Sequence, residues 1–299
     1  MADPVQVVIN GHSYTFRADV LSDPGTRNSY FRLADASFGL KLDAWYGFGF
    51  WDHTFIPYVL FDGDQAVSSV AVCLNEVWWR RTKKMYAQIS TVMTLPRYRR
   101  QGLSRWLMTY ALNEWKGKCH SVYLLANDSA IGFYPKFGFE AFTEYAFTVP
   151  VHSVGGTFRK MDLYDAGDLD LVIHKYGVQN PFAELKVRNL SEFLFHCVTW
   201  HPDDIYYLEV ADAVVIIKRD QNKLICYDIL TAYRGRLNDI IGVFAGEQTE
   251  YACLGFMPVK AENAVCVPSR EEDTHLFVLP GKENIFKDNR VMLPLLSRA

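Results

Sequence analysis

Hydrophobic and polar positions along the first half of the chain follow both regular periods, which predicts a mixed α/β domain. Apolar residues recur at helical spacing in residues 27–38, and again from Leu103 through Trp106 and Leu107 to Ala111. Short apolar runs bounded by Gly, Asn and Asp predict strands. These strands are residues 5–9, 13–16, 54–61, 66–78, 89–94 and 121–126.

A basic loop lies between the strand at 89–94 and the helix that begins near Leu103. Pro96 ends the strand because it cannot donate to a ladder, and arginines precede Gly102. The N-terminus of a helix offers unpaired N–H groups and partial positive charge, so this loop is suited to a phosphate or pyrophosphate. Gly102 has no Cβ to keep such a ligand from the amides. On charge alone, a solvated basic turn is the alternative interpretation.

A second polar segment follows the strand at 121–126. Asn127-Asp128-Ser129-Ala130 has short side chains that accept from first-turn N–H groups, which predicts the cap of a helix. Tyr134 and the dipeptide Gly138-Phe139 come after it. The chain therefore contains two expected strands, at 89–94 and 121–126, that are each followed by a polar segment.

These two segments resemble the signatures of the GCN5-related N-acetyltransferases (GNAT). Residues 99–104, RRQGLS, fit R-x-x-G-x-[G/A/S], the loop that binds acetyl-coenzyme A (acetyl-CoA) in that family, with Ser104 where glycine or alanine is commoner. Residues 127–139 resemble the second signature, N-x-x-A-x-x-x-Y-x-x-x-G-F. The resemblance implies an α/β (α+β) fold with a mixed, largely antiparallel sheet flanked by helices, and acetyl-CoA as co-substrate.

The resemblance also implies roles for individual residues. In this family the strand before the loop splays from its neighbour, and its backbone binds the pantetheine arm. Tyr134 would protonate the departing thiolate, unless it is a buried aromatic residue with a structural role, and Asn127 would bind pantetheine or only cap a helix. The expected cofactor-binding residues are Val92, Met93, Thr94, Arg99, Arg100, Gln101, Gly102, Leu103, Ser104, Arg105 and Asn127.

The acceptor side has a weaker signature. Residues 42–53 are rich in aromatic residues and glycine, which predicts either a loop over the core or a wall of an amine pocket. An alkylamine is mostly protonated at neutral pH, so a base must remove its proton. The candidates for acceptor binding or this base are Trp51, Asp52, His53 and Glu76. Some members of the family use solvent or the C-terminal carboxylate, here on Ala299.

The second half repeats the first faintly. Leu254-Gly255-Phe256 mirrors the segment around Gly138, and three expected strands, at 206–208, 213–218 and 224–230, precede it. The chain resembles tandem GNAT proteins of the enhanced-intracellular-survival type, which implies a GNAT domain at 1–150 and a degenerate, non-catalytic GNAT-like domain at 151–299. An unrelated α+β domain is the alternative. Those proteins have a third, lipid-carrier-like domain for which this chain ends too early, so their antibiotic acetylation is not carried over.

Composition argues against a nucleic-acid-binding protein, a disulfide-rich protein and a membrane-spanning protein. A net charge of −3 argues against non-specific nucleic-acid binding, which needs a basic surface. Six scattered cysteines without a C-x-x-C pair predict a reducing, cytoplasmic setting and no metal site. No apolar run approaches the ~20 residues of a membrane span.

The function expected from these patterns is acetyl-CoA-dependent N-acetylation of the primary amine of a small molecule. The protein is expected to be a monomer or homodimer without membrane or nucleic-acid partners. An acyl-CoA-binding sensor or scaffold with weak or no catalysis is the main alternative. A transferase that uses a longer acyl donor is a third possibility, because pocket depth is not readable from the sequence.

Overall fold

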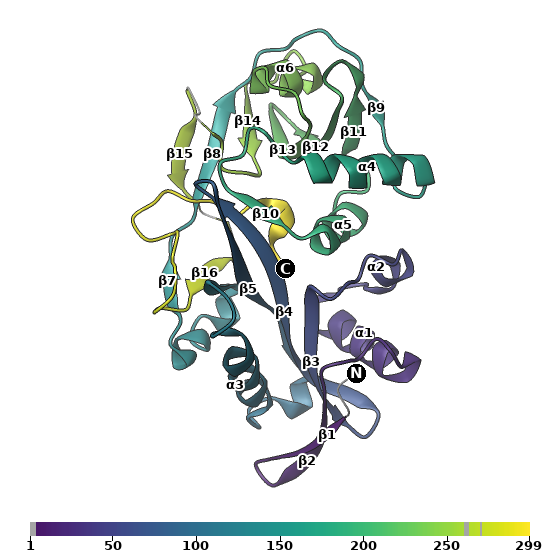
Figure 1. Cartoon of the computed structure of the whole chain (residues 1–299), viewed down its shortest axis with the longest axis vertical. Coiled ribbons are helices and arrows are strands. Elements are labelled where there is room, and N and C mark those ends of the chain that lie inside the picture. The colour runs from purple at the N-terminus through teal and green to yellow at the C-terminus, as the bar shows by residue number, and fades with distance from the viewer. Residues whose placement is uncertain (1–3, 260–262, 270) are drawn as a thin grey trace.

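The computed structural model describes residues 4–259, 263–269 and 271–299, and it contains two sheets (Figure 1). Pairing in the first sheet is antiparallel except between β5 (Thr82–Thr94) and β6 (Ser121–Ala126). A short strand, β10 (Lys186–Arg188), pairs with β4 (Gln65–Trp79) from outside the order of the other strands. The order is β1 (Val5–Ile9), β2 (His12–Arg17), β3 (Phe55–Asp62), β4 (Gln65–Trp79), β5 (Thr82–Thr94), β6 (Ser121–Ala126), β16 (His275–Val278) and β7 (Glu140–Phe142).

The second sheet is also mainly antiparallel, and only β13 and β14 pair in parallel. Its order is β15 (Val265–Pro268), β8 (Tyr145–Pro150), β14 (Tyr251–Leu254), β13 (Lys223–Leu230), β12 (Ala213–Asp220), β11 (Ile205–Leu208) and β9 (Arg159–Lys160). Together the sheets confirm the expected mixed, largely antiparallel α/β fold.

Helices cover both sheets. The longer ones are α1 (Pro24–Phe38), α3 (Leu103–Trp115), α4 (Ala166–Val178) and α5 (Leu190–Thr199), and α2 (Asp43–Gly47) and α6 (Leu237–Ile241) are single turns. The 3₁₀ turns are η1 (Pro96–Tyr98), η2 (Asp128–Ala130), η3 (Tyr134–Phe137), η4 (Glu209–Ala211), η5 (Gly242–Phe244) and η6 (Leu295–Ser297).

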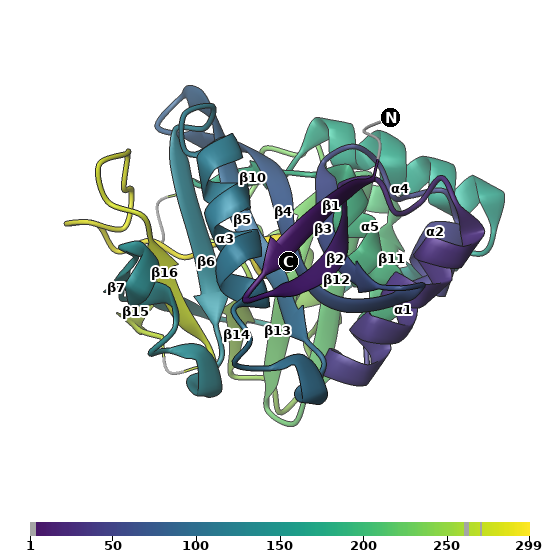
Figure 2. The ribbon, with the colours of Figure 1, turned by 90° about the horizontal axis from the view of Figure 1, so that it is seen from below.

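The first sheet has a separate core on each face, because successive strand residues point to opposite sides. On β4, Val70 and Val72 pack in the cluster that contains α3, whereas Ala71 and Cys73 pack in the cluster that contains α1. The two helices accordingly lie on opposite sides of the strands (Figures 1 and 2). Residues from the two faces can therefore serve two different ligands.

The chain does not divide between the sheets at residue 150, where the sequence placed the domain boundary. Strand β8 lies in the second sheet, between β15 and β14, and β16 returns to the first sheet between β6 and β7. A boundary at 150 puts β8 in the first unit, but the partners of a strand are set by contacts far away in the sequence. The second sheet therefore begins before residue 150, with β8, and the first sheet takes in a strand from near the end of the chain, β16.

Two local expectations also need correction. Asn127 is followed by the 3₁₀ turns η2 and η3 rather than by a capped α-helix, and its side chain instead accepts from the Ser129 hydroxyl at 2.9 Å. Residues 42–53 contain the short helix α2 within an otherwise irregular segment.

No helix in the described parts of the chain combines the length and apolar character that a membrane crossing requires.

Candidate functional site

Strands β5 and β6 part near the middle of the first sheet. Their parallel pairing runs from Tyr86 opposite Ser121 to Ile89 opposite Leu124, and β5 then continues to Thr94 without further pairing to β6 in the described residues. On the β4 side, Thr91 and Val92 together oppose Val70, which is the geometry of a bulge. Beyond Ile89, β5 therefore turns away from β6 and leaves one backbone edge open.

The N-terminus of α3 lies at the end of this open edge. Gly102 is the N-cap residue with φ of +88°, no side chain caps the helix, and its first turn carries no acidic residue. A Cβ on Gly102 would lie 3.1 Å from Nδ2 of Asn10, so the loop and the β1–β2 turn are closely packed. The first-turn N–H groups thus keep their capacity to bind an anion.

Hydrogen bonds fix the loop between its neighbours. Asn10 Nδ2 donates to the Gln101 carbonyl oxygen at 2.7 Å, and the Tyr14 hydroxyl donates to Gln101 Oε1 at 3.2 Å. Nε of Arg99 donates to the Thr94 carbonyl oxygen at 3.2 Å. The loop is therefore held on one side by the first hairpin and on the other by the end of β5.

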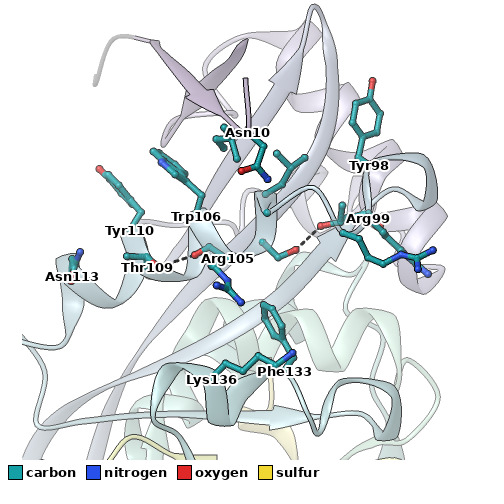
Figure 3. Close-up of a pocket in the computed structure, with 16 residues that line it drawn as sticks. Asn10, Tyr98, Arg99, Arg105, Trp106, Thr109, Tyr110, Asn113, Phe133 and Lys136 are labelled. Carbon is teal, nitrogen blue, oxygen red and sulfur yellow. Dashed lines mark hydrogen bonds between the residues drawn. The ribbon is translucent and has the colours of Figure 1, made fainter. Parts of the chain in front are cut away.

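A cleft of about 890 Å³ opens in front of the loop (Figure 3). Four cationic side chains line it, and none forms an ion pair within the part of the chain that the structure describes; they are Arg99, Arg100, Arg105 and Lys136. All four are exposed. Figure 3 shows Phe133 and Lys136 across the cleft from α3 and Arg105. Unpaired cations around a helix N-terminus suit a polyanionic ligand such as a diphosphate.

Tyr134 lies behind this cleft. Its side chain is 6% exposed and packs against Phe139 and Phe277, with ring centroids 6.3 and 6.0 Å away. Burial raises the pKa of Tyr134 to about 12. Among the described residues its hydroxyl has no hydrogen-bonding partner, and its neighbour Phe133 lines the cleft.

Comparison with known proteins agrees with this geometry. Residues 27–142 match the family model of the acetyltransferase (GNAT) domain. This part of the chain is a GNAT domain. A sequence comparison with curated proteins finds no significant match.

Solved structures extend the likeness beyond the GNAT domain. A protein from Enterococcus faecalis described as a probable N-acyltransferase is 17% identical with a TM-score of 0.59, covering 89% of this chain and 71% of that one. Eis1 from Mycobacterium abscessus is 12% identical with a TM-score of 0.54, covering 87% and 72%. A GCN5-related N-acetyltransferase from Anabaena variabilis is 13% identical with a TM-score of 0.52, covering 88% and 72%. At such identities the likeness establishes the fold, which here includes both sheets.

Most of the expected cofactor-binding residues of the GNAT domain meet at the cleft. Those that line it are Thr94, Arg99, Arg100, Gly102, Leu103, Ser104 and Arg105. Four others do not line it. Met93 is buried on the α1 face, Val92 lies in the bulge, and Gln101 faces the first hairpin. The fourth is Asn127, whose side chain bonds within its own turn.

The structure adds cleft residues that the sequence analysis did not include. Trp106, Thr109, Tyr110 and Asn113 lie one helical turn apart along α3, so the helical period could have found them. The remaining lining residues come from the first hairpin, from the loop and from η3 with the residue before it, and they are Ile9, Asn10, Tyr98, Phe133 and Lys136. The contribution of the hairpin depends on tertiary packing and has no local signature.

The four acceptor candidates do not form a common site, and none lines the cleft. Trp51 is stacked on Trp45 with ring centroids 4.5 Å apart. The Asp52 carboxylate accepts from the backbone N–H and hydroxyl of Thr54, at 2.7 and 2.5 Å, and so stabilises a turn, and His53 is exposed beside it.

Glu76 lies farther along β4 and forms an ion pair with Lys83. Although partial burial raises the pKa of Glu76, hydrogen bonds from Lys83 and Trp78 outweigh it and hold that pKa below its usual value. A carboxylate already paired in this way is a poor proton acceptor, which disfavours Glu76 as the base.

Proposed function

We propose that the protein is an acetyl-CoA-dependent N-acetyltransferase that acts on the primary amine of a small molecule by direct acetyl transfer. The observation that supports this most strongly is the open edge of β5 beyond Ile89, which leads to an uncapped helix N-terminus among four unpaired cations. A linear ligand with a diphosphate at one end and amide groups along its arm matches both features.

Different residues of the cleft would bind the diphosphate and the pantetheine arm of acetyl-CoA. The first-turn amides of α3 would hold the diphosphate, with Arg100, Arg105 and Lys136 adding charge-assisted hydrogen bonds. The backbone of β5 from Val92 to Thr94 would pair with the pantetheine arm as an added strand does. When bound, acetyl-CoA supplies an acetyl group already activated as a thioester.

Tyr134 is the proposed proton donor to the departing thiolate. With a pKa of about 12, its hydroxyl is protonated throughout the pH range of an assay and is always available to donate. A thiol has a reference pKa of ~8.5, so transfer from a phenol requires direct contact between the two groups. The Tyr134 hydroxyl is free to make such a contact, since no described protein group forms a hydrogen bond with it.

Binding and turnover test this proposal separately. Titration calorimetry with acetyl-CoA should give saturable binding to the wild type, and the double variant Arg100→Gln/Arg105→Gln should bind at least about 100-fold more weakly, because two charge-assisted contacts of about 1.5–3 kcal/mol each are lost. Arg81→Gln is the matched control, since Arg81 lies in the turn between β4 and β5, away from the cleft. Absence of binding to the wild type would refute the proposal.

Thiol release across a panel of alkylamines, arylalkylamines, polyamines and aminoglycosides then tests catalysis. Release with at least one amine is expected. Tight binding of acetyl-CoA without release for any of them would instead favour the acyl-CoA sensor or scaffold. Comparing acetyl-CoA with longer acyl donors in the same assay would separate acetyl transfer from transfer of a longer chain.

A further inference from the structure

A second cavity, of about 180 Å³, lies between the first sheet and helix α5. Three of its residues belong to strands of the first sheet near the bulge: Cys73, Ser90 and Thr91. Aromatic side chains form much of the remaining wall, and they are Trp45, Phe55, Phe195 and Trp200. The cavity is thus mostly apolar, with a few polar atoms gathered at the sheet.

Strand β5 separates this cavity from the cofactor cleft. Thr91 lines the cavity and Thr94 lines the cleft, and Cys73 and Trp45 belong to the cluster on the α1 face. Thr91 has φ of +40°, which is rare for a β-branched residue, and its buried hydroxyl has no partner in the described chain. The two sites therefore lie on opposite faces of β5 and are lined there by residues three positions apart.

Glu192 carries the only side-chain carboxylate among the residues that line this cavity, and Ala299 lies in the same lining. Its side chain is 4% exposed and Oε2 accepts from the Cys73 thiol at 3.3 Å, while Oε1 has no hydrogen-bonding partner in the described residues. The helix holds it firmly, because Asn189 caps α5 by accepting from the Glu192 backbone N–H at 3.0 Å. A buried carboxylate oxygen without a donor is costly unless a ligand supplies one.

Arg298 also lines the cavity but does not neutralise Glu192. Its Nη1 pairs with Glu271 at 2.5 Å and its Nη2 with Glu144 at 3.3 Å, while its buried Nε has no hydrogen-bonding partner in the described residues. Burial raises the pKa of Glu192 to about 8, which is what an unpaired carboxyl in an apolar site undergoes. Within the described residues, neither a cation nor a hydrogen-bond donor is therefore paired with Oε1 of Glu192.

We propose that this cavity binds the amine-bearing end of the acceptor, with Oε1 of Glu192 accepting from its nitrogen. The proposal rests on the proposed function and identifies its acceptor site. An incoming ammonium group would pass one proton to Glu192 in its ionised form, so that the N–H bond breaks, an O–H bond forms and the electron pair stays on nitrogen. The amine is then neutral at the bulge, beside the end of the pantetheine-binding edge.

Size and wall chemistry define the class of acceptor. A dry apolar cavity of about 150 Å³ can hold one benzene molecule, so this cavity has room for a single ring with a short chain. Its aromatic walls favour such a ring and also attract a cation. We therefore infer that the acceptor is a primary arylalkylamine or an alkylamine of similar size, for which 2-phenylethylamine is a suitable probe.

Binding of this probe to the full chain tests the cavity without requiring turnover. Wild-type protein should bind 2-phenylethylamine saturably in titration calorimetry, and 2-phenylethanol, which has the same shape without the amine, should bind at least 10-fold more weakly. At pH 9, where the wild-type carboxyl is ionised, Glu192→Gln keeps the volume and removes the charge, so it should weaken amine binding at least 10-fold while the Kd for acetyl-CoA changes less than twofold. Glu247→Gln, at an exposed position, should behave as the wild type.

Turnover then links the cavity to catalysis. With 2-phenylethylamine as acceptor, kcat/KM should fall at least 30-fold in Glu192→Gln and stay within twofold in Glu247→Gln. Unchanged amine binding and unchanged kcat/KM in Glu192→Gln would overturn the inference even if the enzyme is active, and so would absence of amine binding to the wild type. Loss of amine binding in Glu192→Gln without thiol release from the wild type would support the cavity and count against the proposed function.

Discussion

The side-chain oxygens of Thr94 and Ser104 lie 2.7 Å apart, and this hydrogen bond ties the end of β5 to the first turn of α3. The two elements form adjacent walls of the cleft, so the bond fixes the open strand edge relative to the helix N-terminus. Thr94 is itself held from the other side, since its hydroxyl also lies 2.8 Å from that of Ser68 on β4.

Replacing Ser104 by alanine should therefore affect stability more than binding. The loss of one partly buried hydrogen bond is expected to lower the free energy of unfolding by about 0.5–1.5 kcal/mol. Backbone amides rather than the Ser104 hydroxyl are the proposed anion ligands, so the Kd for acetyl-CoA should change less than threefold. Urea unfolding and calorimetry measure the two quantities, and a tenfold loss of affinity would show that the hydroxyl itself binds the ligand.

Gly102→Ala tests the close approach at the helix N-terminus. A Cβ there is strained by a φ of +88° and crowds Asn10, so a loss of about 1–2 kcal/mol in stability and at least a 10-fold loss of acetyl-CoA affinity are expected. Gly138→Ala is the matched control, because its φ of +89° brings the same backbone strain while nothing lies within 4 Å of the new Cβ. Equal affinity losses in the two variants would contradict a specific role for Gly102.

Some of the features behind these predictions can be predicted from the sequence, and others depend on contacts between distant residues. The phosphate loop was predictable because its residues are contiguous between Thr94 and Arg105 and each local pattern agrees with the next. The hydrogen bond from Asn10 to Gln101 spans 91 positions, and it fixes the loop without any local signal. The insertion of β16 between β6 and β7 is equally non-local, because a short apolar run does not specify its partner.

The acceptor side was even harder to predict from the sequence, because its contacts are also non-local. The aromatic segment makes Trp51 and its neighbour Asp52 candidates for the acceptor site, yet Trp51 packs into the core and Asp52 stabilises a turn. Glu192 had no sequence signature, since it lies in an amphipathic helix of the second half. Only the packing of α5 against the first sheet brings Glu192 to Cys73, 119 positions away.

Tyr134→Phe should separate chemistry from cofactor binding. Removal of a proton donor typically costs 10²–10⁴-fold in rate, so kcat should fall about 100-fold or more while the Kd for acetyl-CoA stays within twofold. Because the pKa of Tyr134 is raised to about 12, the wild-type rate should show no decline attributable to this group up to about pH 10. Tyr251→Phe, in the second sheet, is the control. A Tyr134→Phe enzyme with full kcat would exclude this residue as the acid.

Glu192 should make the stability of the protein depend on pH. Its pKa is raised to about 8 by burial, whereas in the unfolded chain a glutamate titrates near ~4.3. Between these values the folded state retains a proton that the unfolded state has released, so stability is greatest below about pH 4.3 with respect to this group and falls as the pH rises toward 8. Glutamine cannot titrate, and Glu192→Gln should remove this part of the dependence.

The measurement is the free energy of unfolding by urea at pH 5, 6, 7 and 8 for both proteins. The stability of Glu192→Gln minus that of the wild type should increase by about 2–4 kcal/mol over this range. Nearby titrating groups, the Cys73 thiol, the Tyr123 hydroxyl and the His196 imidazole, are present in both proteins and largely cancel in the difference. Parallel curves would mean that the Glu192 carboxylate is already paired or hydrated, and with it the reason for assigning the cavity to an amine would disappear.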